Sequence, residues 1–191
     1  NGGRTGLTQE QAAAAGIEAT SVVCVLDDKA HYYPGASSFI VKLTAETASR
    51  RILGIQVLGA GAVDKMVDIA VTGIYNGMKL DEFDTMDFAY APPFSTAIHP
   101  FVTACYILEN KLDGVIDSMS PSEYASGAAK EYTVLDALPA PSIPNARWIE
   151  LPKVVEPVEG LDKDAKLLLV CAKGKRGYFL QNRLKALGYT N

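Results

Sequence analysis

Apolar residues gather in three short segments within the first sixty residues, and this pattern predicts β-strands. The segments cover residues 21–26, 38–44 and 51–58. β-Branched residues recur in each of them, and turn-forming residues lie between them. Because the connecting segments are short, we expect the three strands to form an antiparallel sheet.

A spacing of three and four residues between apolar positions predicts a helix that begins at residue 63 and is ended by Gly77. A stripe at this spacing faces a protein core and carries no chemistry. Its members are Val63, Met66, Val67, Ala70, Val71 and Ile74.

Capping signals predict two further helices in the same half of the chain. The sequence at residues 8–11 has the form of a capping box, with a short helix expected over 9–15 and Gly16 after it. Pro100 stands at the first position of the second helix, which is expected to run to about residue 110.

The glycines at 59 and 61 follow a predicted strand and precede a predicted helix, as they do in a dinucleotide-binding fingerprint. The position of the third small residue is occupied by Asp64, and no acidic residue ends a second strand of a βαβ unit. We therefore interpret the glycines as a tight strand-to-helix turn and expect no cofactor to bind to this chain.

The second half of the chain alternates strands, loops and helices, which predicts a small α/β unit. Ser120 is the expected cap of a short helix, with Pro121 at its first position and Glu123 closing a capping box. Further elements are expected at 132–136 (strand), 146–151 (short strand), 166–170 (buried parallel strand) and 177–187 (helix).

The loop between the last strand and the last helix contains Cys171, and this cysteine is the candidate nucleophile. Loop amides and the positive end of the following helix favour the thiolate form of such a residue. The alternative is a structural cysteine that ends a strand. Lys173, Lys175 and Arg176 make the entrance of the loop positive, which suits anionic substrates. We expect Arg176 to be catalytic together with Cys171, and the substrate to be bound by Ala172, Lys173, Gly174 and Lys175.

Composition narrows the possible functions further. The chain has 191 residues, a net charge of −4 and 48% hydrophobic residues. The net charge gives no indication of nucleic-acid binding, and no apolar run reaches the length that spans a membrane. Three scattered cysteines argue against a disulfide framework or a metal site and fit a reducing, cytoplasmic environment. Cys24 and Cys105 are expected to be core thiols.

Two loops with aromatic residues are candidates for more than a structural role. Tyr32 and Tyr33 precede a Pro-Gly turn, and Tyr90 precedes adjacent prolines. From residue chemistry alone, these tyrosines are surface anchors. In this chain, however, the aromatic loops occur together with two other motifs in a fixed order. The four motifs read GLTQEQA (6–12), YYPG (32–35), ILGIQ (52–56) and YAPPFS (90–95).

Together the four motifs resemble the C-terminal dimerisation domain of the FAD- and NAD-dependent disulfide reductases, in the branch of coenzyme A-disulfide reductase, NADH oxidases and polysulfide reductases. The resemblance covers residues 1–112 and implies an α+β domain that forms a homodimer. It also implies that two tyrosines reach the redox cysteine and substrate in the partner subunit's flavin site. By motif position these are Tyr32 and Tyr90, with Tyr33 the alternative to Tyr32. FAD, NAD(P)H and coenzyme A are implied for the full-length enzyme.

The later motifs VLD (134–136), IPNA (143–146) and LLVCAKGKR (168–176) resemble a rhodanese domain, whose active-site loop has the form C-x4-R. Phosphatases of related form need C-x5-R, which the spacing from Cys171 to Arg176 excludes. The motif departs from the family at Ala137, where Arg is usual, and the segment before IPNA is abbreviated. The family also continues with a further strand and helix, so we expect an incomplete rhodanese unit.

The sequence thus predicts a dimerisation domain over 1–112, a linker over 113–119 and a rhodanese-like α/β domain over 120–191. We expect the C-terminal part of a coenzyme A-disulfide or polysulfide reductase fused to a sulfurtransferase. Cys171 would carry a persulfide, and the substrates would be coenzyme A disulfide or persulfide, polysulfide or thiosulfate. The alternative is a dimerisation and interaction module with a rhodanese-like fold that does not turn over.

Overall fold

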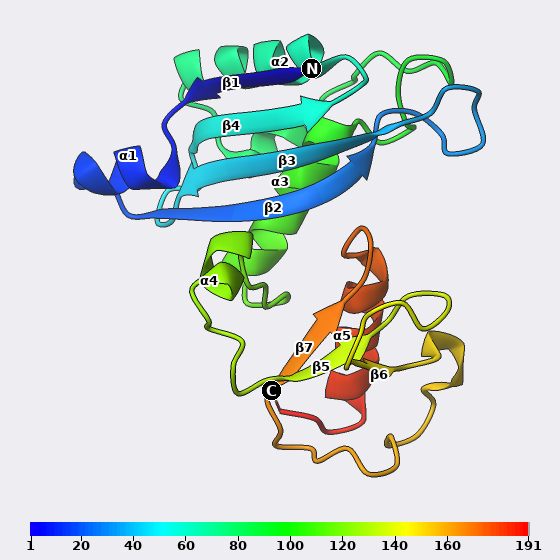
Figure 1. The fold of residues 1–191 in the computed structure, drawn as a ribbon. Coiled ribbons are helices and arrows are strands. Elements are labelled where there is room, and N and C mark those ends of the chain that lie inside the picture. Colours follow the sequence, from blue (N-terminus) through cyan, green and yellow to red (C-terminus); the bar gives the residue numbers. More distant parts are fainter. Residues whose placement is uncertain (191) are drawn as a thin grey trace. The chain divides into compact units, whose positions relative to one another are not determined.

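The computed structural model describes residues 1–190, and these residues form two compact units. Unit 1 is Asn1–Ser118, and unit 2 begins at Met119 (Figure 1). Each unit buries a hydrophobic cluster of its own. The predicted fold class, an antiparallel sheet with helices followed by a small α/β unit, is confirmed.

Unit 1 contains a four-stranded antiparallel sheet in the order β1-β4-β3-β2. The strands are β1 (Gly2–Gly6), β2 (Ala19–Asp27), β3 (Ser38–Glu46) and β4 (Ile52–Gly59). The last three confirm the predicted strands. The first was not predicted, because three of the five residues in its sequence GGRTG are glycine, which is depleted in strands, and Thr5 alone is β-branched.

The helices of unit 1 begin and end close to the predicted residues. They are α1 (Gln9–Ala14), α2 (Val63–Tyr75) and α3 (Pro100–Leu112), with a 3₁₀ turn, η1, at Leu80–Phe83 that the sequence did not predict. Both α2 and α3 lie against one face of the sheet (Figure 1). Thr8 and Gln11 form the predicted capping box of α1.

One member of the predicted α2 stripe does not face the core. Val71 is 45% exposed, whereas Val63, Met66 and Ala70 are buried. At 3.6 residues per turn, position 71 lies roughly 80° around the helix from position 63, at the edge of the stripe. The inclusion of Val71 in the core face was therefore wrong.

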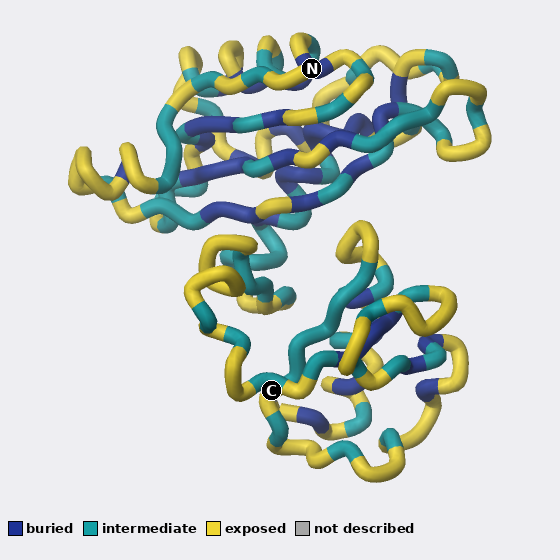
Figure 2. The backbone as a smooth tube through the Cα atoms, viewed as in Figure 1, coloured by how far each residue is buried: buried dark blue, intermediate teal, exposed yellow. Residues whose placement is uncertain are grey.

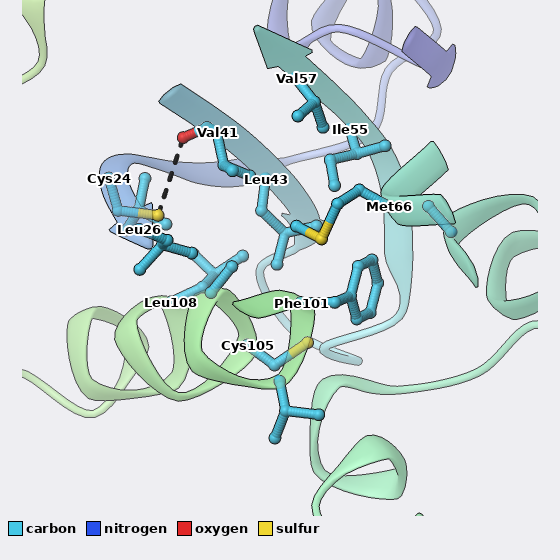
Figure 3. Close-up of a cluster of buried hydrophobic side chains, with 14 of the residues drawn as sticks. Cys24, Leu26, Val41, Leu43, Ile55, Val57, Met66, Phe101, Cys105 and Leu108 are labelled. Carbon is cyan, nitrogen blue, oxygen red and sulfur yellow. Dashed lines mark hydrogen bonds between the residues drawn. The ribbon is translucent and has the colours of Figure 1, made fainter. Parts of the chain in front are cut away.

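The core of unit 1 lies between the sheet and the helices. Buried residues concentrate along the central strands (Figure 2), and Figure 3 shows their side chains meeting Met66 of α2 and Phe101, Cys105 and Leu108 of α3. Cys24 Sγ lies 3.7 Å from the carbonyl oxygen of Val41, to which it donates a hydrogen bond. The core placement of both Cys24 and Cys105 is confirmed.

Unit 2 is a three-stranded parallel sheet in the order β6-β5-β7. Its strands are β5 (Thr133–Asp136), β6 (Arg147–Trp148) and β7 (Leu167–Val170), and its helices are α4 (Pro121–Ala125) and α5 (Lys175–Ala186). A 3₁₀ turn, η2, covers Leu151–Lys153.

Three predictions for unit 2 need correction. The strand expected over 146–151 contains only two residues, and Leu151 belongs to η2. The final helix begins at Lys175 rather than at 177, because Gly174 adopts a φ of 80° and ends the loop there. β7 is parallel as predicted, but it is half-buried rather than buried, because within the described residues it pairs with β5 alone and forms an edge of the sheet.

No helix in residues 1–190 combines the length and apolar character that a membrane crossing requires.

Candidate functional site

Cys171 lies directly after β7, in a loop that leads into α5. The loop is short because Gly174 turns the chain through a positive φ, a conformation that a residue with a Cβ adopts only at a cost. Cys171 is partly buried, whereas Ala172, Lys173, Gly174 and Lys175 are exposed. The structure therefore presents the predicted entrance residues to solvent around a half-accessible thiol.

The first turn of α5 faces the sulfur of Cys171. The backbone N–H of Gly177 donates a hydrogen bond to Cys171 Sγ at 3.4 Å. Gly177 is buried, and a Cβ placed on it would lie 3.6 Å from the carbonyl oxygen of Leu169. An N–H donor at the positive end of a helix favours an acceptor that carries negative charge. The sequence predicted amides around this sulfur but did not identify the residue that supplies one.

Arg176 makes a structural contact from the first turn of α5. Its Nε donates a hydrogen bond to the carbonyl oxygen of Ala137, the residue that follows β5. This contact ties the first turn of α5 to the end of the central strand. Lys175, its neighbour, places Nζ 6.0 Å from the ring centroid of Phe179. The positive charge of Lys175 therefore lies at the start of α5, which the hydrogen bond of Arg176 ties to the end of β5.

Asp136 organises the loop that follows β5, and the sequence analysis did not single it out. The residue is 1% exposed, and its carboxylate accepts hydrogen bonds from the backbone N–H groups of Leu138 at 2.9 Å, Ser142 at 2.8 Å and Ile143 at 3.0 Å. The signal available in the sequence was an Asp before a turn rich in Pro and Ser, which is typical of a side chain that closes its own loop. Trp148 Nε1 donates to the Leu138 carbonyl at 3.0 Å and fixes the same loop.

Burial raises the pKa of the Asp136 carboxyl, but the three backbone donors outweigh it and hold the pKa below its usual value. A lowered pKa in the folded state stabilises the protein fully above the unfolded pKa of about 3.9, and this stabilisation is lost as the pH falls through the folded pKa. We expect the urea midpoint of unit 2 to fall between pH 5 and pH 3, and the Asp136→Asn variant to lose most of this dependence. Fluorescence of Trp148, the single tryptophan of the chain, measures the transition.

Glu131→Gln is the matched control for that experiment. The Lys166 ammonium also lowers the pKa of Glu131, but that pair is exposed. Exposed pairs contribute little to stability, so this variant should keep the acid dependence of the wild type. If the urea midpoint of Asp136→Asn changed with pH as much as that of the wild type, this acid dependence could not be assigned to Asp136.

The two candidate tyrosines of unit 1 lie in surface loops. Tyr32 is 74% exposed and Tyr90 is 53% exposed, while Tyr33 is half-buried. Asp28 closes the first loop by accepting from the backbone N–H of Ser37 at 2.7 Å and from its hydroxyl at 3.0 Å. Within unit 1, Tyr32 and Tyr90 are accessible to a partner molecule.

The other two cysteines lack the surroundings of Cys171. Burial raises the pKa of the Cys24 thiol to about 12. Burial also raises the pKa of Cys105, with Glu109 and Asp84 adding to the effect. Neither thiol ionises near neutral pH, so both are packing residues.

The glycine turn between β4 and α2 does not form a dinucleotide site. β4 belongs to an antiparallel sheet, whereas the dinucleotide fingerprint requires parallel strands joined by a helix. A Cβ on Gly61 would lie 2.8 Å from Asp28 Oδ2, so this glycine serves the close approach of a carboxylate. This turn therefore does not have the structure of the dinucleotide fingerprint.

Comparisons with known protein families divide the chain in the same order as its motifs. Residues 1–101 match the model of the dimerisation domain of pyridine nucleotide-disulphide oxidoreductases. Residues 106–191 match the model of the rhodanese-like domain.

Curated relatives and solved structures of the same kind extend this similarity. The NAD(P)H sulfur oxidoreductase (CoA-dependent) of Pyrococcus furiosus is 31% identical over 107 residues, which are 56% of this chain and 24% of the relative. The coenzyme A disulfide reductase of Staphylococcus aureus strain bovine RF122 is 37% identical over 71 residues, 37% of this chain and 16% of the relative.

Among solved structures, a NAD-dependent persulfide reductase from A. fulgidus aligns over 100% of this chain and 35% of its own, with a TM-score of 0.89 and 30% identity. The reduced Bacillus anthracis CoADR-RHD aligns over 99% of this chain and 35% of its own, with a TM-score of 0.87 and 26% identity. The chain thus spans about a quarter of its first curated relative and about a third of these two structures.

Proposed function

Because this chain belongs to the pyridine nucleotide-disulphide oxidoreductases, a family of enzymes, and carries a rhodanese-like domain behind the dimerisation domain, we propose that it is the C-terminal part of a reductase of coenzyme A disulfide or polysulfide. Unit 1 forms a homodimer, and unit 2 transfers sulfane sulfur through Cys171. FAD and NAD(P)H bind to other domains of the same protein, and the enzyme is cytoplasmic. The names of the relatives support this substrate class.

The observation that carries the sulfurtransferase proposal is the hydrogen bond from the Gly177 N–H to Cys171 Sγ at the start of α5. A structural cysteine at the end of a strand has no need of a helix N-terminus directed at its sulfur. A nucleophilic cysteine does, because the attacking species is the thiolate. The exposed Lys173 and Lys175 beside it suit a substrate with negative charge.

The reaction with thiosulfate proceeds in two displacements. The Cys171 thiolate attacks the outer, sulfane sulfur of thiosulfate and forms an S–S bond, and sulfite leaves with the electron pair of the bond that breaks. The terminal sulfur of the resulting persulfide is then attacked by an acceptor such as cyanide or a thiolate. Cys171 leaves this step as a thiolate, ready for another cycle. Coenzyme A persulfide or polysulfide donates sulfur by the same attack.

We expect the 191-residue chain to gain one sulfur atom in mass when it is treated with thiosulfate, and to lose it on addition of cyanide. Peptide mapping by mass spectrometry should place the added sulfur on Cys171. Cys24 and Cys105 serve as internal controls, because their buried thiols should remain unmodified. A sulfur found on either of them, or on none of the three, would refute the proposal.

The tyrosine loops of unit 1 support the second part of the proposal, in which Tyr32 and Tyr90 act at the redox site of the partner subunit. Both rings are accessible on unit 1, and a phenol can donate a hydrogen bond to a leaving thiolate. Tyr33 is the alternative to Tyr32.

In the full-length dimer, Tyr90→Phe should lower the rate of NAD(P)H-dependent reduction of coenzyme A disulfide roughly tenfold or more, because the phenol oxygen is lost while the ring is kept. Steady-state kinetics measures the effect. Tyr75→Phe is the control, since Tyr75 is 90% exposed on α2 and lies outside the motifs. A rate unchanged by Tyr90→Phe, or lowered equally by both changes, would remove Tyr90 from the site.

One contact favours the alternative function, an interaction module without turnover. Arg176 Nε is bound to the Ala137 carbonyl oxygen, so this nitrogen is committed to the fold rather than to a substrate. The two functions differ in the reactivity of Cys171. A sulfurtransferase should be alkylated by iodoacetamide at pH 7 faster than an ordinary free thiol, and an inert module should not.

A further inference from the structure

A second candidate site lies in unit 1, in a small cleft beside the Pro-Pro loop that follows Tyr90. The cleft has a volume of about 130 Å³. Four parts of unit 1 line it: the residues directly after β2, the start of β3 at Phe39, the turn into α2 with the first turn of that helix, and the segment from the Pro-Pro loop to the start of α3. Its charged and polar lining residues are Asp28, Lys29, Lys65 and His99.

His99 supplies the cleft with a buried hydrogen-bond donor. The residue is 5% exposed, and its Nδ1 accepts a hydrogen bond from the backbone N–H of Phe101 at 3.2 Å. Because Nδ1 is an acceptor, the neutral ring carries its proton on Nε2. Phe88 stacks on the ring at 4.9 Å between centroids. Among the described residues none accepts a hydrogen bond from Nε2, and His99 is one of the residues that line the cleft.

The ring stays neutral at physiological pH. Burial, and to a smaller extent the charge of Lys65, lowers the pKa of His99 to about 4. A neutral imidazole with its proton on Nε2 donates a hydrogen bond but adds no charge of its own. Positive charge in the cleft comes from the lysines.

The electrostatic surroundings favour a negatively charged occupant. Two ammonium groups, those of Lys29 and Lys65, line the cleft together with one carboxylate, that of Asp28. This carboxylate already accepts two hydrogen bonds from Ser37 and lies 3.7 Å from Lys29 Nζ. Ala62, the first flanking residue of α2, provides no side-chain cap, so the positive end of this helix is open to another acceptor. Asp64 adds a carboxylate in the first turn of α2, but it is exposed and does not line the cleft.

We propose that this cleft binds an oxyanion, the phosphate or carboxylate group of a small ligand, through the Nε2–H of His99, the ammonium groups of Lys29 and Lys65, and the start of α2. The volume admits a group of this size but not a whole nucleotide, so the remainder of a larger ligand would lie outside. The pairing of a helix start with cationic side chains is a general way of holding such groups. The site is independent of the function proposed for Cys171.

The chain contains only two histidines, His31 and His99, so ¹⁵N-histidine NMR observes the site directly. His31→Gln, a change in an exposed loop, identifies the remaining signal as His99. We expect the Nε2 resonance of His99 to shift saturably with inorganic phosphate, while the His31 signal does not. Acetate, titrated separately, distinguishes a preference for carboxylate from one for phosphate, and sodium chloride at matched ionic strength is the control.

Charge variants test whether the cleft is responsible. Lys65→Gln should weaken phosphate binding roughly fivefold, the effect of losing one nearby charge at a partly exposed site. Lys29→Gln should also weaken phosphate binding, and this variant takes the place of Lys65→Gln if the latter does not fold. Lys42→Gln, a change on β3 outside the cleft, should have no effect. A His99 signal that moves equally with chloride, or a Lys42→Gln effect as large as that of Lys65→Gln, would overturn the proposal.

Discussion

A chain in which Cys171 is replaced by serine is expected to lose thiosulfate:cyanide sulfurtransferase activity by roughly 10³-fold or more. A serine hydroxyl is not ionised at neutral pH, and its oxygen cannot carry a sulfane sulfur through the second displacement. The hydrogen bond from the Gly177 N–H has the sulfur as its acceptor, so the first turn of α5 should survive the change. Formation of thiocyanate measures the activity.

Two controls separate a lost nucleophile from a damaged fold. Cys105→Ala removes a thiol from the core of unit 1 and should leave the transfer rate unchanged. Trp148 fluorescence of the Cys171→Ser variant should match that of the wild type, because this tryptophan is tied to the loop after β5 rather than to the cysteine loop. Equal activity in wild type and Cys171→Ser would end the sulfurtransferase proposal for this chain.

The local chemistry of the cysteine loop could be predicted from the sequence, but its supporting contacts could not. The sequence places Cys171 in a loop before a helix, and the structure confirms this, but Arg176 lies in the first turn of α5 rather than in the loop. The carbonyl partner of Arg176 lies 39 positions away in the sequence and is brought close by folding, whereas the donors to Asp136 lie within seven positions of it. The type of a residue shows whether its side chain can donate or accept a hydrogen bond, but the tertiary structure decides which atom is its partner.

The same limit applies to the fold. Strands β2, β3 and β4 were predicted because apolar side chains facing a core leave a periodic pattern. β1 was not, since three of its five residues are glycines without side chains and it pairs with β4 through its backbone. The burial of β7 was overestimated because an unbroken apolar run does not reveal whether a strand has a neighbour on both sides.

The largest expected loss of stability concerns the pairing of β1, the strand that the sequence did not predict, with β4. Gly6 of β1 and Gly54 of β4 are directly paired, and a Cβ on Gly54 would lie 2.1 Å from the carbonyl oxygen of Leu7. Backbone atoms cannot move aside as a flexible side chain can. The glycine in the ILGIQ motif is therefore required by the close approach of the first strand, although nothing in the motif itself shows it.

Gly54→Ala should lower the free energy of unfolding of unit 1 by about 3 kcal/mol, because β1 must separate from β4 to admit the methyl group. Urea unfolding followed by circular dichroism measures the loss. Hydrogen exchange should show reduced protection at the Leu7 N–H, which donates to the Leu53 carbonyl at 2.8 Å. Gly2→Ala is the matched control in the same strand pair, since its Cβ would meet Leu58 Cδ1 at an ordinary 3.7 Å and should change stability by no more than about 0.5 kcal/mol. Equal stability of the two variants would mean that β1 does not approach β4 as closely as the structure places it.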